Sequence, residues 1–104
     1  MIIPASELIA AAKSNCDCLD HVEEKLYFDR NKDTTIIDVR EPKEVEDSKL
    51  KDSVNIPRGL LEMKIIELCE KHDAPILIHC KTGGRASLSA NTLQIMGYSN
   101  VHII

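Results

Sequence analysis

The feature that most constrains this chain is a buried-strand pattern that leads through a short glycine-containing loop into a helix pattern. Pro75 opens the apolar run Ile76 to Ile78, which has the composition and length of a strand buried on both faces. From Ala86 to Met96 apolar residues recur at helical spacing, and Gly97 stands where a helix C-terminal glycine belongs. Such strand and helix alternation predicts an α/β fold with a parallel sheet and with the loop at the carboxyl ends of its strands.

The loop from Cys80 to Arg85 begins with a thiol and ends with a guanidinium. Unpaired amides, the positive end of the helix dipole and the two loop cations create a field that favours a thiolate at Cys80. Gly83 and Gly84 can adopt positive φ, so the loop amides can curl inward around an anion. We therefore predict that Cys80 is a nucleophile; a buried structural cysteine is the alternative. The predicted binders of an anionic substrate or a terminal sulfur anion are Lys81, Thr82, Gly83, Gly84 and Arg85.

This loop resembles the active-site loop of the rhodanese family of single-domain sulfurtransferases, in which a catalytic cysteine opens a six-residue loop closed by arginine. The related loop of cell-cycle phosphatases has five residues between cysteine and arginine, whereas this chain has four. A tight ring of amides suits one sulfur atom, and a phosphate needs a wider ring. Loop length therefore favours sulfur transfer over a phosphatase or arsenate reductase; a non-catalytic binding or redox-sensing module is a further alternative.

The resemblance implies a fold and a reaction. The implied fold is a three-layer α/β/α domain with five parallel strands, the first beside the last and the strand before Cys80 in the middle. The implied reaction moves a sulfane sulfur from a small anionic donor such as thiosulfate onto Cys80 as a persulfide. A thiophilic acceptor, either cyanide or a small or protein thiol, then removes that sulfur. No cofactor is implied.

Composition sets the outer limits on function. The 104 residues, 43% hydrophobic and 29% charged, are enough for one domain. We divide them into an N-terminal helical extension, residues 1–15, and a rhodanese-like domain, residues 16–104. The net charge of −4 argues against nucleic-acid binding, and no apolar run approaches the ~18 residues of a membrane span. Without a recognisable secretion signal, a cytoplasmic location with reduced thiols is expected by default.

A second motif follows the strand predicted from Thr34 to Val39. The run Asp38-Val39-Arg40-Glu41 resembles a signature of the family, and Glu44 continues it. We predict that Asp38, Arg40 and Glu44 support the site without taking part in chemistry. Where the family commonly has glycine, histidine and glycine, this chain has Ser48, Lys49 and Asp52. Either Ser48 and Asp52 adopt positive φ at some cost, or the turn differs.

Arg58 is a further candidate for binding an anion. The run from Pro57 to Glu62 resembles a subgroup of single-domain rhodaneses in which this connection lies beside the active-site loop. The resemblance therefore makes Arg58 a cation that could steer an anionic substrate. The alternative is a solvated surface pair between Arg58 and Glu62.

Cysteines and histidines elsewhere receive mostly structural predictions. Cys16 and Cys18 lie two apart on a predicted strand, 16–19, and supply only two ligands, so we predict a structural pair and no metal site. A resolving thiol for Cys80 is the alternative for this pair. Cys69 is predicted in the core. His79 should point away from Cys80 because side chains alternate along a strand. The histidines predicted as plain surface or turn residues are His21, His72 and His102.

Helix and strand patterns cover the remaining chain. We expect helices over 5–13, with an apolar stripe of Leu8, Ile9 and Ala12, and over 20–28, with Val22 and Leu26 facing inward. A strand over 54–56, a helix that begins near Leu61 and keeps its spacing up to His72-Asp73, and a last strand over 101–104 follow. Rhodaneses usually continue with a helix that bears tryptophan, which this chain lacks. We expect that the chain is truncated, or that the extension or a second subunit covers that surface.

Overall fold

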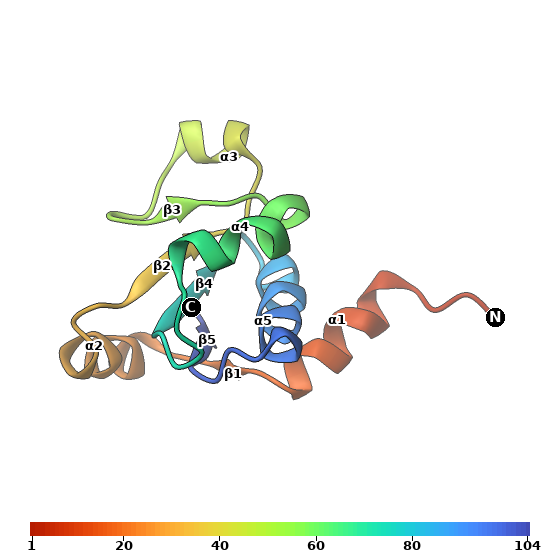
Figure 1. Ribbon diagram of the computed structural model, residues 1–104. Coiled ribbons are helices and arrows are strands. Elements are labelled where there is room, and N and C mark those ends of the chain that lie inside the picture. Colours follow the sequence, from red (N-terminus) through yellow and green to blue (C-terminus); the bar gives the residue numbers. More distant parts are fainter.

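Five parallel strands form one sheet in the order β1-β5-β4-β2-β3, with β4 in the middle (Figure 1). The computed structural model describes residues 1–104. All four neighbouring strand pairs are parallel, and the first strand lies beside the last. The predicted α/β class and strand arrangement are therefore confirmed. The strands are β1 (Asp17–Cys18), β2 (Thr35–Asp38), β3 (Val54–Asn55), β4 (Ile76–His79) and β5 (Val101–Ile103).

Helices lie on both faces of the sheet (Figure 1). On one face α4 (Leu61–Leu68) and α5 (Gly84–Met96) pack together, and α1 (Ala5–Ser14) packs along α5. On the other face lies α2 (His21–Arg30), where the ring of Tyr27 meets that of His102 edge-on at a centroid distance of 5.0 Å. A short helix α3 (Pro42–Asp47) precedes β3, and one 3-10 turn, η1 (Arg58–Leu60), precedes α4. None of these helices is both long enough and apolar enough to span a membrane.

The core lies between the sheet and the α4/α5 face. Alternate residues of β2, β4 and β5 point into it, and they meet apolar residues of the two helices. Alanines of α5 at this contact let the helix approach the sheet closely. Each fully buried isoleucine or leucine contributes ~1.5–3 kcal/mol to folding. The fully buried core residues are Ile37, Val39, Leu61, Ile65, Ile76, Ile78, Ala86, Ala90 and Leu93.

Two predictions about packing were wrong. In α2, Val22 is 70% exposed and Leu26 is 49% exposed, so neither faces inward as predicted. The helix is anchored instead through the Tyr27 hydroxyl, which donates a hydrogen bond to Asn100 Oδ1 at 2.8 Å. His102 is not a plain surface residue but lies in β5, with a buried Nδ1 that makes no hydrogen bond and lies 3.8 Å from Asp17 Oδ2. Both differences depend on how α2 packs on this sheet face, where Tyr27 contacts the His102 ring, and a single-sequence pattern does not reveal that packing.

The turn after α3 shows how the chain accommodates its departure from the family pattern. Asp52 has φ of 63°, the positive value predicted as one option, whereas Ser48 is extended at φ of −158°. Aspartate is one of the few residues other than glycine that adopts this conformation readily. The helix α3 itself was not predicted; Pro42 begins it, and a reciprocal capping box joins Glu41 and Glu44.

Candidate active site

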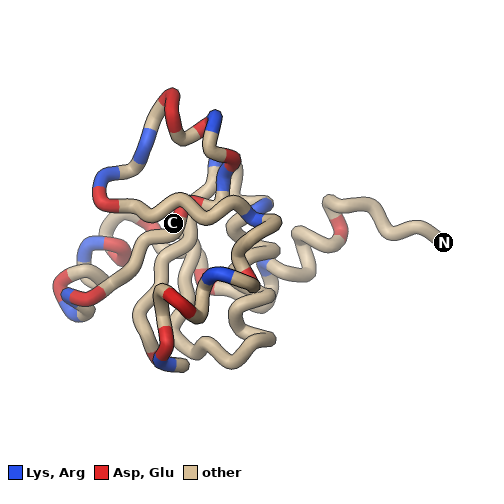
Figure 2. Tube along the Cα trace, turned by 45° about the horizontal axis from the view of Figure 1, so that its top comes forward, with Lys and Arg blue, Asp and Glu red and all other residues tan.

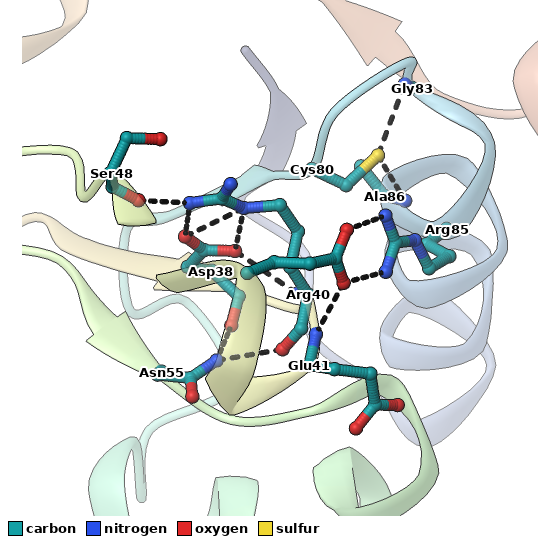
Figure 3. Close-up of polar contacts among 10 residues, drawn as sticks. Asp38, Arg40, Glu41, Ser48, Asn55, Cys80, Gly83, Arg85 and Ala86 are labelled. Atoms are coloured by element: carbon teal, nitrogen blue, oxygen red, sulfur yellow. Dashed lines mark hydrogen bonds and ion pairs between the residues drawn. The ribbon is translucent and has the colours of Figure 1, made fainter. Parts of the chain in front are cut away.

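Cys80 lies directly after β4, with its sulfur at the entrance to α5 (Figure 3). The backbone amide of Gly83 donates a hydrogen bond to Cys80 Sγ at 3.0 Å, and that of Ala86 donates another at 3.3 Å. The residue is only 4% exposed. Two amides at the positive end of a helix dipole stabilise negative charge on the sulfur, because they replace the water that a buried thiolate loses. One amide of the predicted nest, that of Gly83, therefore faces the Cys80 sulfur, and the second donor, the Ala86 amide, comes from α5.

The two glycines of the loop have different structural roles. Gly83 has φ of +90° and caps α5, whereas Gly84 is not among the residues with positive φ. A Cβ on Gly84 would lie 3.1 Å from Ile9 Cδ1 of α1, so this glycine permits close packing of the N-terminal helix on the loop. The prediction of positive φ was right for Gly83 and wrong for Gly84.

A cavity of about 600 Å³ opens at Cys80. The loop contributes Lys81, Thr82 and Gly83 to its lining, and further lining residues come from the chain before and within α2. Two lysines, Lys13 and Lys81, line the cavity, whereas Glu24 is its one acidic lining residue. The lining residues outside the loop are Lys13, Cys16, Cys18, His21, Glu24, Leu50, His79, Ser87, Ile103 and Ile104.

Lys13 is a site residue that sequence reasoning missed. Its Cε and Nζ lie 3.9 Å from the position that a Cβ on Gly83 would occupy, and it lines the cavity beside Cys80. The segment that carries α3 has many basic and acidic residues side by side, as Figure 2 shows. In contrast, Lys13 is the one lysine or arginine among the first 20 residues. Only the packing of α1 on α5 and the loop brings this isolated cation to the thiol.

Arg85, which is labelled in Figure 3, is paired with Glu44 and is not free for a substrate. Its two terminal nitrogens donate to the two carboxylate oxygens of Glu44 at 2.7 and 2.9 Å. The hydrogen bonds from Arg85 and from the Glu41 amide lower the pKa of Glu44 to about 2. In turn, the carboxylate raises the pKa of Arg85. Arg85 does not line the cavity, so the structure supports a loop-fixing role where we predicted substrate binding.

Asp38 and Arg40 form a second ion pair beside the loop. The Arg40 guanidinium donates to both oxygens of the fully buried Asp38, at 2.8 to 3.2 Å, and to the carbonyl of Ser48 at 2.8 Å. Burial raises the pKa of Asp38, but the hydrogen bonds from Arg40 more than offset this and leave it lowered. The Asn55 amide donates to the carbonyls of both residues at 2.9 Å. This geometry is what a scaffold role for the pair requires.

Arg58 does not reach the cavity. Its guanidinium donates to Glu62 at 2.8 Å and to the hydroxyl of Thr92, on α5, at 3.2 Å. Thr92 lies two turns beyond the start of α5, away from Cys80. The anion-steering prediction is therefore not supported, and the alternative of a surface pair with Glu62 describes what the structure shows.

His79 and the N-terminal cysteines also border the cavity. His79 makes no hydrogen bond with Cys80, and its place in β4 puts it on the face opposite the core, as predicted. Cys16 is half-buried and Cys18 is exposed, and neither is in a disulfide. Cys69 is buried in the core, as predicted, far from the cavity lining. No group of three potential ligands that could hold a metal ion is present.

Comparisons with known proteins agree on one family. The model of the family Rhodanese-like domain matches residues 22–104. The thiosulfate sulfurtransferase RDL2, mitochondrial, of Saccharomyces cerevisiae is 34% identical over 79 residues, covering 65% of this chain and 53% of RDL2. A sulfurtransferase of Allochromatium vinosum is 26% identical over 69 residues, covering 66% of this chain and 63% of that protein. The chain spans only 40% to 63% of the length of the curated relatives that it matches.

A solved structure resembles almost the whole chain. It is a protein of unknown function and possible tyrosine phosphatase from Rhodopseudomonas palustris, 27% identical, with a TM-score of 0.84. The superposition covers 99% of this chain and 85% of that one, so it includes α1 and β1, which lie before the family match.

Proposed function

The chain belongs to the rhodanese-like domain family, and on that premise we propose that it transfers a sulfane sulfur through a persulfide on Cys80. Relatives that are named sulfurtransferases support sulfur transfer at the level of the family. The observation that carries the proposal for this chain is the position of Cys80 Sγ, which accepts hydrogen bonds from the amides of Gly83 and Ala86 at the floor of a cavity.

The reaction has two steps. The Cys80 thiolate attacks the outer sulfur of a donor such as thiosulfate, the sulfur–sulfur bond of the donor breaks, and sulfite leaves with the bonding electron pair. Cys80 then carries a persulfide. In the second step the acceptor attacks the outer sulfur of this persulfide, and the Cys80 thiolate is the leaving group. Cyanide would give thiocyanate, and a thiol would take the sulfur as a new persulfide.

Loop amides and nearby lysines supply the electrostatics. Hydrogen bonds to Cys80 Sγ stabilise it as nucleophile in the first step and as leaving group in the second. A well-placed donor of this kind contributes about 3 kcal/mol in acyl-transfer sites. Lys13 and Lys81, both in the cavity lining, attract a small anionic donor.

A phosphatase is the second candidate, and the likeness to the Rhodopseudomonas palustris protein favours it. Phosphate chemistry on a cysteine loop needs an arginine whose donors face the phosphate oxygens. In this chain the two terminal nitrogens of Arg85 are bonded to Glu44. The loop also has one residue fewer than that of the cell-cycle phosphatases. Both observations favour sulfur transfer.

Mass spectrometry after exposure to thiosulfate tests the proposal. We expect an adduct of ~32 Da, one sulfur atom, on the wild-type protein, because the thiolate is the attacking species. Cyanide should remove the adduct, and thiocyanate should appear in the same amount. Cys80→Ser should form no adduct, whereas Cys69→Ser, which alters a thiol outside the cavity, should form it normally. Hydrolysis of p-nitrophenyl phosphate without any sulfur adduct would instead establish the phosphatase.

A further inference from the structure

The burial of Cys80 poses a problem for any large acceptor. The residue is 4% exposed, and its sulfur accepts hydrogen bonds from the Gly83 amide of its loop and from the Ala86 amide of α5. Cyanide or a small thiol can enter the cavity, whereas a folded protein surface would have to approach the persulfide through the mouth of the cavity. A sulfur closer to solvent would be easier for a protein acceptor to reach.

Two further thiols line the same cavity and become progressively more exposed. Cys16 is half-buried and packs against the edge of the core, and Cys18 is exposed. The remaining cysteine, Cys69, is in the core and does not line the cavity. Three of the four cysteines in the chain therefore border one cavity, although Cys16 and Cys18 are more than 60 positions from Cys80 in the sequence.

Specific contacts place the two thiols relative to the loop. The Cys16 thiol donates a weak hydrogen bond to the carbonyl of Ser87 at 3.9 Å. Ser87 follows Ala86, whose amide binds Cys80 Sγ, so Cys16 and Cys80 contact the same first turn of α5. Cys18 ends β1 and pairs with Ile103 of β5, the strand next to β4. The three thiols therefore line one cavity, and their exposure rises from Cys80 through Cys16 to Cys18.

We propose that Cys16 and Cys18 form an internal acceptor that takes the sulfane sulfur from Cys80 and carries it to the surface. This inference rests on the proposed persulfide at Cys80 and names its first acceptor. The final acceptor would then be a thiol on a macromolecule that contacts Cys18.

Each transfer is an exchange of sulfane sulfur between two thiols and needs no external oxidant. The Cys16 thiol loses its proton to solvent in the cavity, and its thiolate attacks the outer sulfur of the Cys80 persulfide. A new sulfur–sulfur bond forms on Cys16, and the old one breaks, with its electron pair going to Cys80 Sγ. The amides of Gly83 and Ala86 stabilise this leaving thiolate, which favours the transfer. A second exchange of the same kind moves the sulfur from Cys16 to Cys18.

The first transfer should be slower than the loading of Cys80. Burial and the charge of Asp17 raise the pKa of the Cys16 thiol, so the reactive thiolate is scarce there. The sulfur label should consequently appear on Cys80 first and on the N-terminal pair later.

Trypsin separates the relevant thiols, which makes the path directly measurable. Cleavage after lysine puts Cys16 and Cys18 on the peptide Ser14–Lys25, Cys69 on Ile65–Lys71 and Cys80 on His72–Lys81. After a short pulse of thiosulfate, iodoacetamide is added at successive times and alkylates each persulfide on the cysteine that carries it at that time. We expect label first on His72–Lys81, then on Ser14–Lys25, and none on Ile65–Lys71.

Three variants identify the route. Cys80→Ser should leave Ser14–Lys25 unlabelled, because the pair receives its sulfur only from Cys80. In Cys16→Ser/Cys18→Ser the label should remain on His72–Lys81. Cys18→Ser alone replaces an exposed residue and keeps the packing of Cys16. In this variant the fragment-ion spectra of Ser14–Lys25 should locate the added sulfur on Cys16. Mixing the loaded double variant with Cys80→Ser should not label the latter, since the transfer is internal.

The outcomes separate this inference from the proposed function. Stable label on His72–Lys81 with Ser14–Lys25 unmodified in the wild type would overturn the relay and leave the sulfurtransferase proposal intact. Equal labelling of Ser14–Lys25 in Cys80→Ser would also overturn it, because the pair would react with thiosulfate directly. Transfer between molecules at the wild-type rate would contradict the internal path. No label on any peptide would refute both proposals.

Discussion

Glu44 and Arg85 join the loop after Cys80 to the segment after β2 through two hydrogen bonds, at 2.7 and 2.9 Å, between residues 41 positions apart in the chain. The same carboxylate accepts the amide of Glu41 at 2.9 Å and so also begins α3. One side chain therefore fixes both the last residue of the active-site loop and the neighbouring helix.

The first prediction concerns the acid stability of this pair. Because the pKa of Glu44 is lowered to about 2 from 4.5, the pair stabilises the fold at pH above 4.5, and that stabilisation is lost as pH falls toward 2. Glu44→Gln lacks this titration. Urea unfolding should show the wild type more stable than Glu44→Gln near neutral pH and the difference vanishing near pH 2. If the difference in unfolding free energy between the two proteins persists unchanged near pH 2, then the Glu44–Arg85 ion pair does not contribute to stability as predicted.

A comparison of two adjacent glycines tests the loop geometry. Gly83→Ala forces a side chain into φ of +90° and should cost about 1–2 kcal/mol of stability. It should also slow sulfur transfer, because the Gly83 amide binds Cys80 Sγ. Gly84→Ala has ordinary φ and meets only the flexible end of Ile9, so sulfur transfer should be nearly unchanged. Measurements of thiocyanate formation and urea midpoints check both; equal losses would argue against the predicted role of the Gly83 amide.

Lys13 should strengthen binding of an anionic donor. We expect Lys13→Met to raise KM for thiosulfate about fivefold, equivalent to ~1 kcal/mol of charge interaction, while kcat changes little. Lys64→Met is the matched control, since Lys64 is exposed on α4 and outside the cavity lining. The effect should shrink as salt is added, because ions screen exposed charges. A loss of kcat with unchanged KM would point to another role for Lys13.

Two arginine–carboxylate pairs of this chain should differ in their importance for folding. Arg40→Ala leaves the fully buried carboxylate of Asp38 without its partner, which is strongly destabilising. Arg58→Ala breaks a surface pair with Glu62, and such pairs contribute at most ~1 kcal/mol. Thermal unfolding of the two variants should show a severalfold larger loss for Arg40→Ala. If Arg58→Ala is the more destabilising variant, then the hydrogen bond from Arg58 to Thr92 contributes more to stability than the exposure of the Arg58–Glu62 pair indicates.

Much of the fold was predictable because the relevant signals are local. The apolar run before Cys80, the positive φ of Gly83 and the glycine that ends α5, Gly97, each depend on neighbouring residues, and all three are present as predicted. Predictions failed where distant segments decide the outcome. The exposure of Val22 and Leu26 depends on what covers the α2 face of the sheet, and no pattern within α2 records that.

The sequence alone determined the parallel α/β class and the loop at the Cys80 sulfur, because strand and helix periodicity and backbone conformation depend on adjacent residues. The central place of the strand before Cys80 was implied by the resemblance to the rhodanese family. Tertiary structure alone decided that Arg85 pairs with Glu44, that Arg58 stays at the surface, and that Lys13 reaches the site. It also decided that Cys16 and Cys18 border the same cavity as Cys80. These relationships depend on which remote segments the sheet order and the packing of α1 bring together, and spacing along the chain does not encode that proximity.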